Sequence, residues 1–286
     1  MNTTLNHTIR KFNRFELKYL ITLQQAEKFK DALRAYMHPD EHGSDNGRYA
    51  LASLYYDSPD LRCYWEKEYG IRYRRKLRLR RYEGSENLTA GETLTEETPI
   101  FVEIKQRIDR VTQKRRAVLP YSDALRLCND RQIPDHAPED KAVIEEIYVY
   151  LWQYNLRPVS IVRYDRQAFI GSAYDLGLRV TFDTALTFQA HPLHLHEAPS
   201  GLPMMPANRV VMEVKVNERI PSWLLELVAN HNLHVERVSK YCRSIEIAQN
   251  MPALRWRYLP PESATDALAS VPAVFQPVQK MMGARR

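Results

Sequence analysis

The stretch RKLRLRRY, at residues 75–82, decides the fold. Successive side chains of a β-strand point to opposite faces of its sheet, so Lys76, Arg78 and Arg80 would share one face while the leucines between them share the other. The stretch therefore predicts a strand with one cationic face and one apolar face.

The same alternation recurs along the chain. Three segments, at 15–18, 102–105 and 212–215, each read apolar-Glu-apolar-Lys, which places a carboxylate and an ammonium side by side on one strand face. In other segments, polar side chains also share one strand face. These sets are Tyr164 with Arg166, Lys114 with Arg116, and Arg179 with Thr181 and Asp183.

Two interpretations of the charged faces are open. They are the solvent side of an ordinary antiparallel sheet whose apolar side is covered by helices, or they line the lumen of a sheet that closes on itself, with helices outside. Exposed strand faces mix Thr, Ser, Gln, Lys and Glu, whereas this set repeatedly uses Arg, which suits planar oxyanion recognition. The set as a whole therefore favours a charged tunnel suited to a metal-bound polyphosphate.

Strand-like and helix-like segments alternate along one continuous domain, for which we expect residues 10–250. The predicted strands are 12–20, 47–56, 72–83, 100–108, 110–119, 157–170, 177–189 and 208–217. The predicted helices are 22–37, 59–69, 121–130, 139–154, 221–231 and 239–249. Residues 1–9 are an N-terminal extension, and the Pro-rich segment 251–286 is expected to be a disordered tail.

Composition sets broader limits. The 286 residues are 44% hydrophobic and 27% charged, which excludes a disordered chain, a collagen-like fibre and a disulfide scaffold. Three widely spaced cysteines, no apolar signal core and no membrane-spanning apolar stretch lead us to expect a reduced, cytoplasmic protein. The formal net charge of +6 weakly favours an anionic partner.

The sequence does not favour two other binding functions, zinc binding and nucleic-acid binding. The histidines of HPLHLH, at 191–196, resemble zinc ligands, but they lie in a Pro-rich loop without a second ligand cluster, so a solvated loop is favoured. No helix-turn-helix, RNA-recognition or zinc-finger signature is present, and the strand carboxylates would repel a nucleic-acid backbone. We therefore expect no nucleic-acid partner.

Eight motifs resemble, in order, the polyphosphate polymerase domain of the vacuolar transporter chaperone (VTC) proteins. They are FELKY at 15–19, SLYYDSPDLRCYWEKEYG at 53–70, RKLRLRRY at 75–82, VEIK at 102–105, VRYDRQAF at 162–169, LRVTFD at 178–183, VMEVKVN at 211–217 and RVSKYCRS at 237–244. That family belongs to the CYTH-like triphosphate tunnel metalloenzymes. The resemblance implies an α+β fold, a closed antiparallel eight-stranded β-tunnel with helices packed outside.

The resemblance also implies a function, the transfer of the γ-phosphate of ATP to a growing inorganic polyphosphate chain. The residues expected at the reacting phosphates are Lys18, Arg78, Arg80, Lys105, Arg166, Arg179 and Lys240. Those expected to bind the remaining phosphates are Lys114, Tyr164, Arg237 and Ser239. Glu213 would hold Mn²⁺ or Mg²⁺, and the partners would be ATP and inorganic polyphosphate or pyrophosphate.

Departures from the family pattern leave alternatives open. Arg14 stands where hydrolytic members of the superfamily have the first Glu of ExExK, and the loss of that carboxylate favours transfer over hydrolysis. Arg237 replaces a Lys of the eukaryotic polymerase. The alternatives are a tri- or polyphosphatase and a non-catalytic polyphosphate- or nucleotide-binding module. Whether Glu16 and Glu103 also bind metal stays open.

Overall fold

The structure is a computed structural model that describes residues 14–83, 94–109, 111–172, 175, 177–196, 201–217 and 219–250. Its strands are β1 (Arg14–Thr22), β2 (Met37–Pro39), β3 (Arg48–Asp57), β4 (Tyr73–Glu83), β5 (Pro99–Ile108), β6 (Val111–Pro120), β7 (Arg157–Gly171), β8 (Arg179–Gln189), β9 (Leu202–Pro203) and β10 (Arg209–Asn217). Its helices are α1 (Leu23–Leu33), α2 (Ser44–Gly47), α3 (Arg62–Glu68), α4 (Tyr121–Leu125), the π-helical η1 (Arg126–Asp130), the 3₁₀-helical η2 (Pro138–Asp140), α5 (Lys141–Gln153), α6 (Ser222–Asn230) and α7 (Lys240–Ala248).

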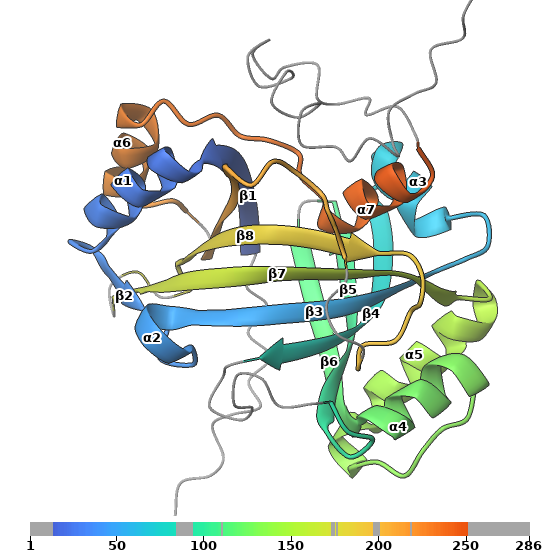
Figure 1. Ribbon diagram of the computed structural model, residues 1–286. Helices are drawn as coiled ribbons and strands as arrows, with labels where there is room; N and C mark the ends of the chain where they lie inside the picture. Colours follow the sequence, from blue (N-terminus) through green and yellow to red (C-terminus); the bar gives the residue numbers. More distant parts are fainter. Residues whose placement is uncertain are drawn as a thin grey trace, which may run out of the picture.

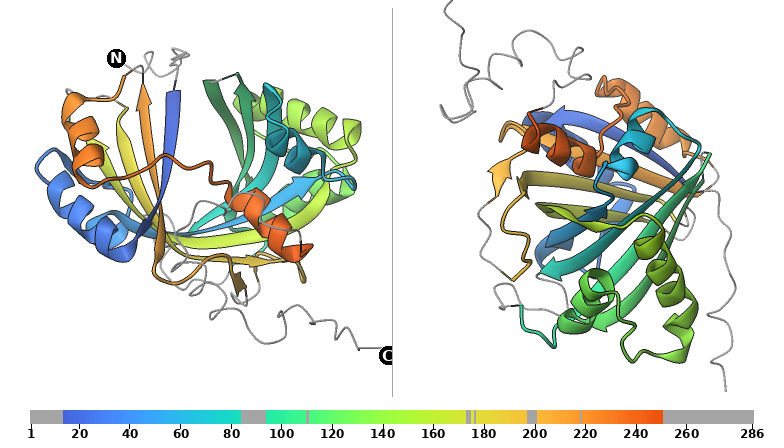
Figure 2. Two further views of the ribbon diagram at one scale, coloured as in Figure 1. Left: turned by 90° about the horizontal axis from the view of Figure 1, so that it is seen from above. Right: turned by 90° about the vertical axis from the view of Figure 1, so that its right-hand side faces the viewer.

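All strands of the described chain belong to one antiparallel sheet. Eight of them follow the order β1-β10-β8-β7-β3-β4-β5-β6, while β2 pairs with β7 and β9 pairs with β8. The sheet bends strongly, so that β1 and β10 form one wall and β4, β5 and β6 form the other, as the left view of Figure 2 shows. The strands β8, β7 and β3 join the two walls (Figure 1).

The expectation of a closed barrel is corrected at one seam. Among the described residues no ladder joins β1 to β6, although the two strands approach each other. The backbone at this edge of β1 bonds to the segment before α7, because the N–H of Glu236 donates to the carbonyl oxygen of Lys18 at 2.7 Å. Instead, Val235 forms an isolated bridge with Tyr19 of β1, and the segment that leads to α7 crosses this side of the sheet (Figure 2).

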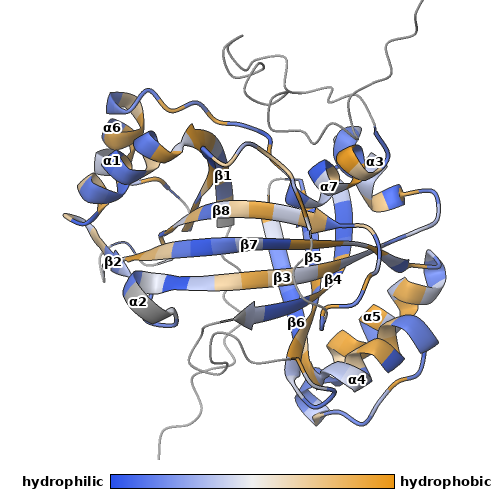
Figure 3. Ribbon diagram, viewed as in Figure 1, coloured by the Kyte–Doolittle hydropathy of each residue, from blue (hydrophilic) through white to orange (hydrophobic). Residues whose placement is uncertain are grey.

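Helices cover the outer face of the sheet, which is the apolar one. Leu77 and Leu79 of β4 are fully buried there, while Arg78 and Arg80 line the inner cavity. One core packs α1 and α6 against β1, β8 and β10, and a second packs α4 and α5 against the other wall. Figure 3 shows a largely hydrophobic α5 and strands whose hydrophilic and hydrophobic residues alternate. The alternation predicted from sequence is therefore confirmed.

The eight predicted strands are present, and β2, β9 and α2 are additional. Thr22 caps α1 through a capping box with Gln25. The prediction that this helix reaches Met37 was wrong: it ends at Leu33, and Met37 opens β2 because Pro39 disfavours helical backbone before it. The predicted extension at 1–9 and tail at 251–286 lie outside the described residues. None of the described helices combines the length and apolarity needed to cross a bilayer.

Candidate functional site

A cavity of about 1150 Å³ lies inside the bent sheet. Its wall comes from β1, β3, β4, β5, β6, β7 and β10, from the turns beside α3, and from the segment 235–241 that leads into α7. Among the described residues that line it, thirteen are Lys or Arg and four are Asp or Glu. The cavity therefore carries a large positive charge that its own carboxylates do not balance.

Glu213 of β10 is the centre of one cluster. The side chains of four cations surround its carboxylate: Lys240 at 2.9 Å, Lys215 at 3.0 Å, Lys18 at 3.2 Å and Arg166 at 3.5 Å. Burial alone would raise the pKa of Glu213, but these cations outweigh it and hold the pKa well below the usual value. Glu213 is only 4% exposed, and the surrounding cations keep it ionised despite this burial.

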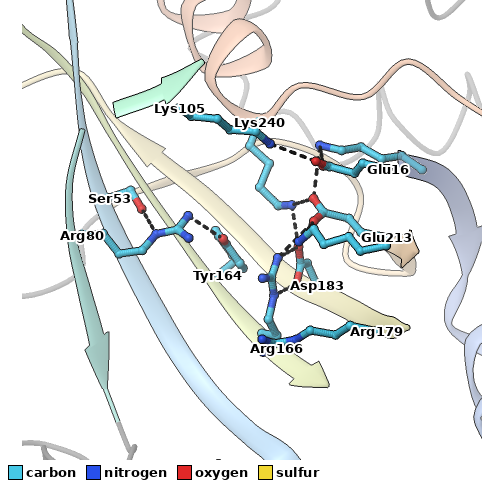
Figure 4. Close-up of polar contacts among 12 residues, drawn as sticks. Glu16, Ser53, Arg80, Lys105, Tyr164, Arg166, Arg179, Asp183, Glu213 and Lys240 are labelled. Carbon is cyan, nitrogen blue, oxygen red and sulfur yellow. Dashed lines mark hydrogen bonds and ion pairs between the residues drawn. The ribbon is translucent and has the colours of Figure 1, made fainter. Parts of the chain in front are cut away.

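Asp183 of β8 fixes two of these cations from below. Its carboxylate accepts two hydrogen bonds from the Arg166 guanidinium, at 2.6 and 2.7 Å, and lies 2.5 Å from the Lys240 ammonium. A guanidinium that donates to both oxygens of one carboxylate has a defined orientation. Figure 4 shows Arg166, Asp183, Glu213 and Lys240 pointing toward one another.

Glu103 of β5 organises the opposite wall. The Arg78 Nε donates to its carboxylate at 2.8 Å, and the Lys114 ammonium donates at 3.0 Å. Another Arg78 nitrogen donates to the hydroxyl of Tyr55 at 3.2 Å. Burial would raise the pKa of Glu103, but Arg78, Arg80 and Lys114 lower it strongly. The carboxylate is fully buried and therefore acts as a fixed counterion.

Arg80 and Glu16 complete the polar lining. The Arg80 guanidinium donates to Ser53 at 3.1 Å and to Tyr164 at 3.2 Å (Figure 4). The Glu16 carboxylate on β1 contacts Lys18 at 3.2 Å and Lys105 of β5 at 2.9 Å. The second contact is an ion pair that crosses the seam between the two walls.

The N-terminus of α7 enters the cavity wall. The Ser239 hydroxyl accepts from the backbone N–H of Cys242 at 3.3 Å, which confirms the predicted cap. The hydroxyl of Tyr241 donates to Asp57, a fully buried carboxylate that also accepts from the backbone N–H of Cys63 at 2.8 Å at the start of α3. Asp57 thus joins α3 and α7 at the end of β3.

Ten of the twelve residues that the resemblance implies lie in the cavity wall. They are Lys18, Arg78, Arg80, Lys105, Tyr164, Arg166, Glu213, Arg237, Ser239 and Lys240. The other two do not reach it. Lys114 is drawn to Glu103, and the Arg179 guanidinium lies 2.6 Å from both the carboxylate of Asp40 and the hydroxyl of Tyr49.

Sequence reasoning missed other residues of the site. Lys215 was visible as the partner of Glu213 in an apolar-Glu-apolar-Lys segment, and Asp183 was visible on the same strand face as Arg179. Burial lowers the pKa of Lys215 to about 8, although Glu213 and Glu16 oppose this shift. Asp57 had no sequence signal as an anchor of α7, because Tyr241 is 184 residues away along the chain.

A bound Mn²⁺ or Mg²⁺ would need oxygen ligands from the cavity wall. Among the residues that the structure describes, no three His, Cys, Asp or Glu side chains gather as a metal cage. Two carboxylates nevertheless face the cavity around Lys18, those of Glu213 and Glu16. Mg²⁺ is commonly bound by one or two carboxylates together with substrate phosphates and water. The residues therefore fit a metal ion that arrives with phosphate ligands.

The sequence model of the VTC domain matches residues 13–249. No curated protein sequence matches the chain.

Solved structures with a similar course of the chain are distant. They include the putative adenylyl cyclase HpAC1 from Hippeastrum, described with a dominant triphosphatase activity (14% identity, TM-score 0.48, 82% of this chain and 95% of that chain). The protein PH1819 from Pyrococcus horikoshii OT3 is similar at 13% identity (TM-score 0.41, 82% and 99%). A putative adenylate cyclase from Vibrio parahaemolyticus is similar at 11% identity (TM-score 0.39, 80% and 98%). The family assignment rests on the sequence match alone.

Proposed function

The chain belongs to the VTC domain family, and from this premise we propose that it is a metal-dependent polyphosphate polymerase. It transfers the γ-phosphate of ATP to the end of an inorganic polyphosphate chain, and ADP leaves. The observation that carries the proposal is the cavity itself, in which thirteen cations and four carboxylates line about 1150 Å³. A linear polyanion is the class of ligand that such a lining attracts.

Phosphoryl transfer needs little covalent chemistry from a protein, because positioning and charge neutralisation supply most of the rate. Arg166 and Lys240 are held in place by Asp183 and are therefore pre-oriented toward the cavity. On the facing wall Arg78 is oriented by Glu103. These cations hold the transferring phosphate between the terminal oxygen of the chain and the departing ADP.

Glu213, with Glu16 beside it, is the residue that would hold Mn²⁺ or Mg²⁺. When bound, the ion supplies Lewis acidity to the phosphate oxygens. Lys18 lies 3.2 Å from both carboxylates and keeps them ionised and therefore ready to act as ligands. The ammonium groups around Glu213 would turn toward the phosphates as these enter.

The electrostatics support transfer to a phosphate acceptor over transfer to water. Water needs a general base, and a carboxylate acts as one most effectively when its pKa lies near the working pH. Burial raises the pKa values of Glu16 and Glu213, but lysines lower both well below 4.5. A terminal polyphosphate oxygen is already ionised and needs no base.

The test is to incubate the purified protein with ATP and either Mn²⁺ or Mg²⁺ and to follow the products. We expect a long anionic polymer and ADP in a chain-length assay on gels. Orthophosphate without polymer would identify a tri- or polyphosphatase instead. Tight binding of ATP or polyphosphate without turnover would identify a binding module.

The metal ligand is tested by Glu213→Gln. This change removes the carboxylate charge, so we expect turnover to fall about 100-fold or more, while binding of polyphosphate without metal is largely kept. The matched control is Glu226→Gln, which makes the same change at an exposed position on α6. Unchanged activity in Glu213→Gln would remove the proposed ligand.

A further inference from the structure

The register of β4, β5 and β6 places cations directly opposite cations. Lys76 of β4 faces Lys105 of β5, and Lys105 faces Lys114 of β6. Arg74, two residues before Lys76 on β4, faces Arg107 of β5. Like charges directly opposite on neighbouring strands destabilise a sheet, so this arrangement calls for an anion between the strands.

The outer part of this lining differs from the inner part in its counterions. Arg78 and Lys114 have Glu103, and Lys105 has Glu16. Arg74 and Arg107 line the same cavity farther out, together with the exposed Arg237. We name these last three residues the outer cation track.

Carboxylates compensate the outer cation track poorly. Burial lowers the pKa of Arg74, and Arg107 and Arg237 lower it further although Glu66 opposes them, so Arg74 is repelled by both of the other cations. The nearby Asp109 lies 3.7 Å from Arg72, and its backbone oxygen accepts from Arg107 at 2.8 Å. Glu236 is the other carboxylate in this part of the wall.

The track also extends the site in one direction. Arg74 precedes Arg78 along β4 by four residues, which corresponds to about 13 Å at about 3.3 Å per residue. A row of cations along a strand fits a linear anion that continues past the inner clusters. It offers nothing to a short anion held between Arg78 and Glu213.

We propose that the outer cation track is a chain-length-selective subsite, which binds the internal phosphates of a linear polyphosphate whose end lies among the inner cations. The nature of this ligand rests on the proposed function. The subsite makes a long chain a tighter ligand than tripolyphosphate, and it keeps the growing polymer attached between successive transfers.

The experiment measures binding of tripolyphosphate and of long-chain polyphosphate without nucleotide or metal. The variant is Arg74→Gln with Arg107→Gln. We expect its affinity for the long chain to fall about 10-fold or more, with a salt dependence lower by roughly two released counterions, one for each arginine removed. Affinity for tripolyphosphate should change less than about 2-fold, since the inner cations remain.

The control is Arg34→Gln with Arg126→Gln, which removes the same charge from two exposed positions off the cavity wall, the C-cap of α1 and the first residue of η1. We expect it to bind both ligands as the unchanged protein does. Thermal melting checks the fold of the test variant. Its stability should not fall, because the charges of two facing cations have been removed. Arg107→Gln alone serves if the double variant fails to fold.

Three outcomes overturn the subsite. They are an equal loss of affinity for both ligands, no loss for the long chain, and tighter binding of single-stranded DNA of equal charge than of polyphosphate. The measurement needs no turnover, so it is independent of the polymerase. A protein that selects long chains but makes no polymer keeps the subsite and rejects the proposed function, and a polymerase that binds all lengths equally does the reverse.

Discussion

Glu103 shows how one buried carboxylate can trade stability against ligand affinity. It is fully buried between Arg78 and Lys114 and is absent from the surface that a ligand would touch. It neutralises the cations that would otherwise bind phosphate more tightly. Its charge therefore stabilises the ligand-free protein and weakens the bound state.

The change Glu103→Gln should separate these two effects. Without ligand we expect the free energy of unfolding to fall by about 3 kcal/mol, because buried cations lose their partner. Affinity for tripolyphosphate should rise about 10-fold, because the same cations are freed. Denaturant unfolding and calorimetric titration measure the two quantities.

Two results would contradict this view of Glu103. One is weaker tripolyphosphate binding in the variant, which would mean that Glu103 mainly orients Arg78. The other is an equal loss of stability in Glu226→Gln, the exposed control. Addition of phosphate should restore most of the lost stability of Glu103→Gln, because an anion replaces the missing counterion.

At the scale of elements, α7 depends on anchors outside the cavity. Its first turn carries Lys240 and Ser239, and Tyr241 ties this turn to the buried Asp57. A second anchor lies farther along the helix, where the Ser160 hydroxyl of β7 donates to Ser244 at 2.8 Å. The first anchor orients the site, whereas the second only attaches the helix.

The two anchors predict different kinetics. Tyr241→Phe removes the hydrogen bond to Asp57 that fixes the first turn of α7, where Lys240 lies. Because Lys240 would then be less well positioned, we expect kcat to fall about 10-fold while KM changes little. Ser244→Ala loses the bond from Ser160 and the bond to the backbone oxygen of Tyr241, so it should lower the free energy of unfolding by about 1 to 2 kcal/mol, with kcat nearly unchanged. Steady-state kinetics and melting curves compare them. Equal kcat values at equal stability would show that Asp57 has only a structural role.

At the scale of the whole molecule, the buried carboxylates determine the response to acid. Although burial raises the pKa values of Glu16, Glu103, Asp183 and Glu213, the surrounding cations lower all four below their usual values. Their stabilising contribution is complete above the unfolded pKa, about 4. It is lost as the pH falls through the lower pKa values of the folded state.

We therefore expect a nearly constant free energy of unfolding between pH 7 and about pH 5, and a steep decrease below about pH 4. Below that point each such carboxylate contributes a slope of about 1.4 kcal/mol per pH unit. Glu213→Gln should reduce the slope by about one carboxylate. Denaturant titrations at a series of pH values measure it, and an unchanged slope would mean that Glu213 is not ionised in the folded protein.

Local sequence predicted the strands and the polarity of their two faces. RKLRLRRY gave this result because the period of two is a property of the backbone and needs no tertiary information. The capping roles of Thr22 and Ser239 could also be predicted, because a helix cap depends on residues only a few positions apart in the chain. The family resemblance then supplied ten residues that the fold brings to one cavity.

The remaining features depend on contacts between distant segments. Arg179 lies on a correctly predicted strand, but Asp40 and Tyr49 draw its side chain away from the cavity. The alternation of residues also cannot show whether the first and last strands of a sheet pair. The seam between β1 and β6 was therefore beyond any pattern within one strand.

That seam has a topological consequence. A continuous barrel can be entered by a long polymer only through its ends, so the polymer must be threaded. In the described part of this protein, the ion pair between Glu16 of β1 and Lys105 of β5 spans the open side of the sheet, and the segment at Val235 crosses the same side. A polymer without a free end can enter such a wall sideways once these contacts part, and it can leave without being cut.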